Sequence, residues 1–210
     1  MSNYQLLHND LPTKVLRSFK GDISIDTETL GLNIKRDRLC LIQLRNESNK
    51  KIYLIKFDKD LSPKNSKNLK TLMEDNSHTK IFHYARFDIA VLKENLNINV
   101  KNFFCTKVAS KLIRTYSSQH GLKDLVKEIL GIELDKNEQS SDWSRNVLTK
   151  KQIQYAINDI LYLSKIKINL ENKLEEFGRT QTFNSIMKFM MTRVELDLMG
   201  WENTDIFAHK

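Results

Sequence analysis

The sequence predicts an α/β fold in which a mixed β-sheet is flanked by helices and followed by a helical C-terminal segment. Apolar runs with the character of strands lie at about residues 22–28, 38–45 and 51–57, and helical spacing dominates from residue 149 onward. A turn that contains Gly31 separates the first two strands, and this closeness predicts that they pair antiparallel. Early strands followed by helices indicate layers of helix packed on sheet.

Strands and helices also alternate in the middle of the chain. The expected elements are a polar helix near 65–75, a strand at 79–84 that runs into a helix, a strand at 102–106, and helices at 107–116 and 121–130. The last of these should end at Gly131, because glycine readily adopts the left-handed conformation that closes helices. With 210 residues and no Gly/Ser-rich linker, residues 1–210 are expected to form a single domain.

The C-terminal part of the chain carries a long helical pattern from 149 to 200 that is interrupted at Gly178. Its second half bears an apolar stripe formed by Phe183, Ile186, Met187, Met190 and Met191. Methionine fills irregular gaps in cores, so this stripe is expected to pack inside the domain. The alternative is that the segment at about 180–210 forms a contact between subunits.

Composition and charge favour a polyanionic partner. The chain has 34 Lys and Arg against 26 Asp and Glu, a net charge of +8 that attracts phosphates, although a general compositional bias could also produce it. Cys40 and Cys105 lie in apolar runs without metal-binding spacing and are expected to be reduced core residues. No window approaches about 18 uninterrupted apolar residues. We therefore expect a soluble, cytoplasmic protein that does not contact a membrane.

A pair of carboxylates closes the first predicted strand. Strand alternation puts Asp26 and Glu28 on one face, while Ile23 and Ile25 point to the other. Like charges this close raise each other's pKa unless a cation neutralises them, and carboxylate oxygens favour Mg²⁺ or Mn²⁺. The alternative is a solvated surface pair.

Two further acids and a phenol lie downstream. Asp88 falls in the first turn of the helix that follows strand 79–84, where its alternative role is to complement the positive helix end. Tyr155 and Asp159 are four residues apart and so share one helical face, although they could form a simple surface pair. Together with Asp26 and Glu28, these residues are what a metal-dependent site for phosphodiester cleavage requires.

The order of these residues resembles that of the 3′-to-5′ exonucleases with four acidic residues, in the tyrosine-bearing subclass that includes ribonuclease D. The surrounding sequence is similar, nearly end to end, to nano-RNase C, a compact relative of ribonuclease D. The matching motifs are Asp26–Leu32, Arg36–Leu44, Lys80–Asp88, His120–Asp124, Gln139–Trp143 and Asp205–His209. The resemblance implies a ribonuclease H-like (DnaQ-like) exonuclease fold.

The resemblance also implies a mechanism and a substrate. Asp26, Glu28, Asp88 and Asp159 would hold two Mg²⁺ or Mn²⁺ ions, and attack by water would release nucleoside 5′-monophosphates. Tyr155 would orient that water, since a phenol with a pKa near 10 is a poor base at neutral pH. Members of the family hydrolyse short RNA, particularly dinucleotides, in the cytoplasm and assemble as octameric rings.

Four residues are candidates for contact with RNA, and each has a structural alternative. Thr27 could meet the terminal ribose; Leu32 could wedge between two bases or be a buried turn residue. His83 could contact substrate or be a core histidine, and Trp143 could stack on a base or pack internally. A wedge at Leu32 in a chain without a further domain favours 5′-phosphorylated RNA dinucleotides. The alternatives are a ribonuclease D-like enzyme that trims RNA 3′ ends, a DNA exonuclease, or a non-catalytic nucleic-acid-binding module.

Overall fold

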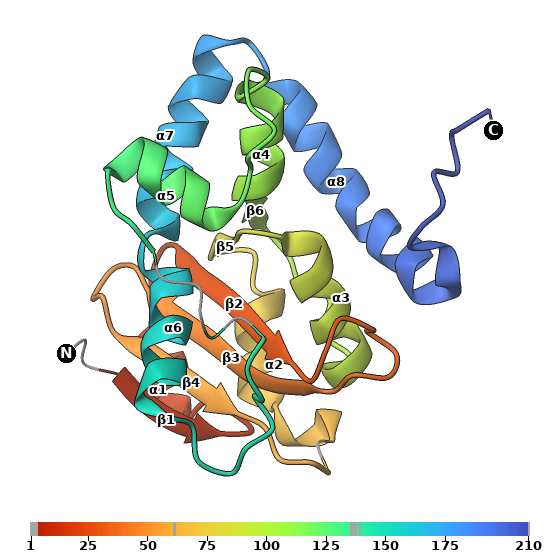
Figure 1. Cartoon of the computed structure of the whole chain (residues 1–210). Helices are drawn as coiled ribbons and strands as arrows, with labels where there is room; N and C mark the ends of the chain where they lie inside the picture. The colour runs from red at the N-terminus through yellow and green to blue at the C-terminus, as the bar shows by residue number, and fades with distance from the viewer. Residues whose placement is uncertain (1–3, 61, 135–137, 139, 210) are drawn as a thin grey trace.

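The computed structural model describes residues 4–60, 62–134, 138 and 140–209; Gln139 of the motif Gln139–Trp143 lies outside them. Within this part of the chain, a six-stranded sheet forms the centre of the fold (Figure 1), with the strand order β1-β4-β3-β2-β5-β6. The strands are β1 (Tyr4–His8), β2 (Ile23–Thr29), β3 (Leu39–Asn46), β4 (Ile52–Lys56), β5 (Lys80–Phe82) and β6 (Phe103–Cys105).

The pairing of the strands makes the sheet mixed, as predicted. β2, β3 and β4 form an antiparallel meander, which confirms the expectation from the short turn at Gly31. β5 and β6 extend the sheet in parallel beside β2, and β1 pairs in parallel with β4 at the other edge. The sequence did not indicate β1, because Tyr4–His8 is only five residues long and does not alternate strictly between apolar and polar residues.

Helices cover both faces of the sheet (Figure 1). They are α1 (Thr13–Leu16), α2 (Lys67–Glu74), α3 (Ala85–Leu96), α4 (Thr106–Ile113), α5 (Leu122–Leu130), α6 (Lys150–Leu161), α7 (Leu163–Glu176) and α8 (Thr180–Leu196), together with the short turns η1 (Pro63–Asn65) and η2 (Asp197–Trp201). Two predicted ends are confirmed by left-handed glycines, since Gly131 closes α5 at φ +69° and Gly178 separates α7 from α8 at φ +64°. The helix expected at 107–116 ends earlier, at Ile113.

β2 lies between two of these helices, and this position determines the site. The Thr27 hydroxyl meets a side chain of α3, whereas Asp26 and Glu28 meet a side chain of α6. Alternate residues of a strand point to opposite faces, so α3 and α6 cover opposite sides of β2. Ile23 and Ile25 are fully buried in the core between the sheet and the helices.

The apolar stripe of α8 packs inward, as expected. Phe183, Met187 and Met190 are buried, and the Phe183 ring centroid lies 4.7 Å from that of Phe104 on β6. Both cysteines are buried and carry free thiols. In the part of the chain that the structure describes, no helix is long and apolar enough to cross a lipid bilayer.

Candidate active site

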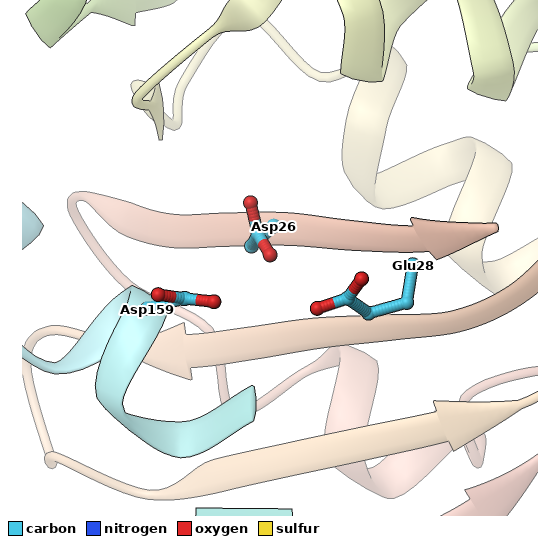
Figure 2. A group of neighbouring side chains, drawn as sticks. All are labelled: Asp26, Glu28 and Asp159. Carbon is cyan, nitrogen blue, oxygen red and sulfur yellow. The ribbon is translucent and has the colours of Figure 1, made fainter. Parts of the chain in front are cut away.

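The carboxylates of Asp26 and Glu28 lie on the part of β2 that has a paired strand on only one side. β5 pairs with β2 only through Ile23 and Ser24, whereas β3 follows β2 along its whole length. The residues after Ser24 therefore face an opening in the sheet. One oxygen each of Asp26, Glu28 and Asp159 lies within 4.8 Å of the others, and Figure 2 shows the three side chains directed toward one another.

The start of α6 is fixed by a reciprocal cap that also holds the preceding loop. The Gln152 amide N–H donates to Thr149 Oγ1 at 3.1 Å, and the Thr149 amide N–H donates to Gln152 Oε1 at 2.9 Å. Gln152 Nε2 donates in turn to Ser141 Oγ and to the Asp142 carbonyl at 3.0 and 2.9 Å. This arrangement fixes the register of α6, and with it Tyr155 and Asp159, against the loop that carries Trp143.

Asp88 approaches the other acids from the opposite side of β2. It lies in the first turn of α3, as predicted, and is only 3% exposed. Thr27 Oγ1 donates to Asp88 Oδ1 at 2.7 Å. The hydroxyl that we expected at the terminal ribose thus orients a carboxylate in this structure, and its contact with substrate stays a prediction.

Burial and mutual repulsion make this cluster electrostatically unfavourable without a cation. Burial is the largest cause of the raised pKa of Asp26, followed by the charges of Asp88 and Asp159 and then that of Glu28. Burial likewise raises the pKa of Glu28 and, to about 7, that of Asp88. Repulsion within the Asp26–Glu28 pair was the predicted cause, but burial and the two downstream acids have larger effects.

Tyr155 is a proton donor in this environment. Burial and the nearby charge of Asp159 raise the pKa of its hydroxyl above the ordinary value, and a hydrogen bond with Asp159 adds to the effect. The Trp143 ring packs against it with the centroids 5.9 Å apart. The phenol therefore stays protonated at neutral pH and is held in place by the indole.

All five residues with a predicted catalytic role line one cavity of about 590 Å³. The four candidates for contact with RNA, Thr27, Leu32, His83 and Trp143, line the same cavity. Tyr84 and Lys107 also line it, and the Lys107 ammonium nitrogen lies 4.4 Å from the Tyr84 ring centroid. Neither was predicted as a site residue, although Tyr84 lies in the motif Lys80–Asp88.

The turn after β2 presents Leu32 to solvent. Its side chain is 85% exposed, so the alternative of a buried turn leucine is wrong. Asp37 holds this turn by accepting hydrogen bonds from the Asn33 amide at 2.9 Å and from Arg36 at 2.7 and 2.9 Å. A Cβ atom on Gly31 would lie 2.5 Å from Asp37 Oδ2, so a larger residue at this position would displace the carboxylate that holds the turn.

His83 and Trp143 are more enclosed than Leu32. His83 Nδ1 lies 2.9 Å from Thr106 Oγ1, which orients the ring at the cavity wall. Trp143 is 2% exposed and packs internally, as its structural alternative proposed. Trp143 also lines the cavity, and stacking on a base stays a prediction.

Several known proteins with similar sequences and structures are nucleases. Residues 7–175 match the model of a family described as 3′-5′ exonuclease. Over the full length of both chains, the protein is similar to Brucella melitensis NrnC, with 44% identity and a TM-score of 0.92. Structures of that nuclease bound to pGG and with bound Mg²⁺ each match with a TM-score of 0.91.

Longer relatives carry the same fold. The chain is 33% identical over 168 residues to ribonuclease D of Desulfotalea psychrophila, a match that covers 79% of this chain and 43% of that protein. It is 25% identical to Escherichia coli RNase D, with a TM-score of 0.75, covering 91% of this chain and 50% of that one. The chain thus spans less than half of the length of the curated ribonuclease D relative. These likenesses confirm the predicted ribonuclease H-like exonuclease fold.

Proposed function

We propose, from the premise that the chain belongs to the 3′–5′ exonuclease family, that it hydrolyses short RNA from the 3′ end to nucleoside 5′-monophosphates as a single domain. The observation that carries the proposal is the convergence of four acids and a phenol on one cavity. The preferred substrate would be an RNA dinucleotide with a 5′ phosphate. The similarity to a nuclease solved with bound pGG supports this choice.

The oxygen ligands of the site are suited to divalent cations. Asp26, Glu28 and Asp159 offer only hard carboxylate oxygens close together, and Asp88 adds a fourth at the same cavity. We assign two Mg²⁺ or Mn²⁺ ions to these residues. Bound cations of this kind lower the pKa of water and stabilise negative charge on a leaving oxygen. The raised pKa values of the acids are explained if the site is built to carry cations.

Tyr155 would position the attacking water. Its pKa is raised, so the hydroxyl keeps its proton and can donate a hydrogen bond but cannot act as a base. The Trp143 ring and the hydrogen bond to Asp159 limit the directions in which the hydroxyl can point. Tyr155 would thus orient the attacking water, while the carboxylates would hold the cations.

The shape of the site suits a substrate of two nucleotides. A cavity of about 590 Å³ lies in the size range of small-ligand pockets. Leu32 is exposed at the end of a braced turn that lines the cavity, whereas Thr27 is buried, and this exposure supports a role for Leu32 as a wedge between two bases. We assign Leu32 as the wedge, Thr27 and His83 to the 3′ nucleotide, and Trp143 to a base.

The test compares initial rates on 5′-phosphorylated RNAs of two, three and seven nucleotides, and on DNA of the same lengths, with Mg²⁺ present. We expect the RNA dinucleotide to be cleaved fastest. Equal rates on the seven-nucleotide RNA would favour a ribonuclease D-like trimming enzyme, and faster cleavage of DNA a DNA exonuclease. No cleavage of any substrate would indicate a non-catalytic binding module.

Leu32→Ala tests the wedge. Loss of a stacking contact worth about 1 to 3 kcal/mol should lower kcat/KM on the dinucleotide by about 5- to 150-fold. Val147→Ala is the matched control, because Val147 is equally exposed, at 81%, but does not line the cavity. An equal loss in both variants would contradict the assignment.

Location and assembly belong to the same proposal. We propose a cytoplasmic enzyme that forms a homo-oligomer, with the octameric ring of nano-RNase C as the expected form. The full-length similarity to Brucella melitensis NrnC supports this proposal.

A further inference from the structure

Gln43 lies directly beside the first metal-ligand candidate. On β3 it is the residue opposite Asp26 in the antiparallel register, and its side chain is 0% exposed. Residues directly opposite in such a pair project to the same face, with Cβ atoms about 4.5 to 5.5 Å apart. Gln43 therefore shares the sheet face that carries Asp26 and that α6 covers with Tyr155 and Asp159.

The amide of Gln43 has no hydrogen-bond partner among the residues that the structure describes. Both Nε2 and Oε1 are buried and unpaired there. Leaving a buried polar group unsatisfied costs about 1 to 3 kcal/mol. Two other buried polar side chains on these strands are paired: Ser24 Oγ donates to Glu47 at 2.6 Å, and Asn46 Nδ2 donates to the Ser18 carbonyl at 2.9 Å. On β2 and β3, the other buried atom without a partner among the described residues is Arg45 Nε, whereas in Gln43 both polar atoms of the side chain are unpaired.

The chemistry of the neighbours decides which way the amide points. An ionised carboxylate only accepts hydrogen bonds, so the Nε2 donors match Asp26. Arg45 lies two residues along the same strand and hence on the same face, and its Nε is a buried donor without a partner among the described residues. The Oε1 acceptor of Gln43 is therefore suited to face the Arg45 Nε donor.

We propose that Gln43 is a positioning residue for the metal site: when a cation binds, Nε2, which is unpaired in the metal-free structure, pairs with the Asp26 carboxylate and holds it in the orientation that keeps the cation bound. The inference rests on the metal-dependent function proposed above. Side chains that orient metal ligands in this way typically change metal affinity or activity by about 10- to 100-fold when they are replaced. A merely structural amide would instead stabilise the metal-free fold.

The test replaces the amide by an apolar side chain of similar length. In Gln43→Met, the affinity for Mn²⁺, measured by calorimetry without substrate, should fall by about 10- to 100-fold. The metal-free melting temperature should stay the same or rise, because a buried unsatisfied amide is removed. Turnover should recover at high Mg²⁺, since the carboxylates themselves remain.

Leu54→Met is the matched control. Leu54 lies opposite Gln43 on β4, faces the same side and is also 0% exposed, but it is one strand further from the acids. Its affinity for Mn²⁺ should equal that of the wild type. Gln43→Leu is the second variant, to be measured if Gln43→Met does not fold.

Two results would overturn the inference: an affinity for Mn²⁺ in the Gln43 variants equal to that of the wild type, or an equal loss in Leu54→Met. A wild-type protein that binds no Mn²⁺ would instead remove the proposed metal site itself. The two failures are therefore distinguishable.

Discussion

At the scale of single residues, ionisation of the buried acids destabilises the metal-free fold. Folding buries Asp88 almost completely, and its pKa rises to about 7 from 3.8. Because the folded state binds a proton more tightly than the unfolded chain, the stability linked to Asp88 is present below pH 3.8 and is lost as the pH rises through about 7. A cation bound by these carboxylates would offset this loss.

The prediction compares Asp88→Asn with the wild type in thermal unfolding under chelator. Asparagine keeps the Oδ1 acceptor for Thr27 but carries no charge. We expect nearly equal melting temperatures near about pH 4 and a more stable variant near about pH 8, together with nearly abolished RNA cleavage at both. Mg²⁺ should stabilise the wild type more than the variant. A difference in melting temperature that does not change with pH would contradict the assigned pKa.

Tyr155→Phe tests whether the hydroxyl orients the attacking water or contributes to binding of the dinucleotide. The variant keeps the ring that packs against Trp143 and removes only the hydroxyl. Because that hydroxyl would contact water rather than RNA, kcat should fall by about 10²- to 10⁴-fold with little change in the dissociation constant of the dinucleotide. Stopped-time assays and binding titrations in Ca²⁺ measure the two quantities. An unchanged kcat would show that the phenol is structural.

Sequence spacing could predict the acids but not their surroundings. Asp26 and Glu28 alternate on a strand, and Tyr155 and Asp159 lie one helical turn apart, so local periodicity is enough to pair them. Gln43 reaches the site only through the register of β2 with β3. Lys107 reaches it only because α4 follows β6 next to β5. Such contacts depend on tertiary structure, which periodicity does not encode.

At the scale of elements, a buried charge cluster joins the C-terminal turn to the helix that carries Asp88. Asp197 in η2 accepts from Arg86 of α3 at 2.6 and 2.7 Å and from Arg193 of α8 at 2.9 Å. The Asp197 side chain is 3% exposed. Arg86 lies in the same helical turn as Asp88, so this cluster braces the end of α3 that faces the active site.

We predict that Asp197→Ala lowers the free energy of unfolding by about 3 kcal/mol, because two guanidinium groups lose their buried counter-charge. Glu195→Ala is the control. Its pair with Lys93 also joins α8 to α3, at 3.0 Å, but the Glu195 side chain is 49% exposed, so the loss should stay below about 1 kcal/mol. Urea unfolding of both variants measures the difference. Similar losses in the two would show that the cluster is no stronger than a surface pair.

The elements that the sequence did not predict have no local signal in the sequence. β1 is short and exposed, and its place in the sheet comes from pairing with β4 rather than from an apolar pattern. The break between α6 and α7 falls at Tyr162, where neither glycine nor proline marks it. By contrast, Gly131 and Gly178 marked their helix ends correctly because a left-handed residue is costly for other side chains.

At the scale of the whole molecule, apolar surface collects after α8. Figure 1 shows the last residues turning back from the end of α8 on the side away from the sheet, and the Phe207 ring centroid lies 5.9 Å from that of Phe189 on this helix. Met199, Trp201, Ile206 and Phe207 are 68%, 49%, 45% and 77% exposed. The stripe on α8 itself is used in the core, so the surface available to another subunit lies further along the chain than the stripe. Several large apolar side chains in so short a segment favour a protein partner over solvent.

We therefore predict a homo-oligomer larger than a dimer in which a second copy of the chain covers this segment. Light scattering at micromolar concentration should give a mass several times 24.7 kDa. The double variant Met199→Ser and Phe207→Ser should shift the mass toward the monomer, since both replaced side chains are mostly exposed in a single copy. Val147→Ser, which removes an equally exposed apolar side chain from the loop before α6, should leave the mass unchanged. A wild-type protein with the mass of one chain would refute the assembly. If the variant dissociates but still cleaves the dinucleotide at the wild-type rate, each subunit carries a complete active site.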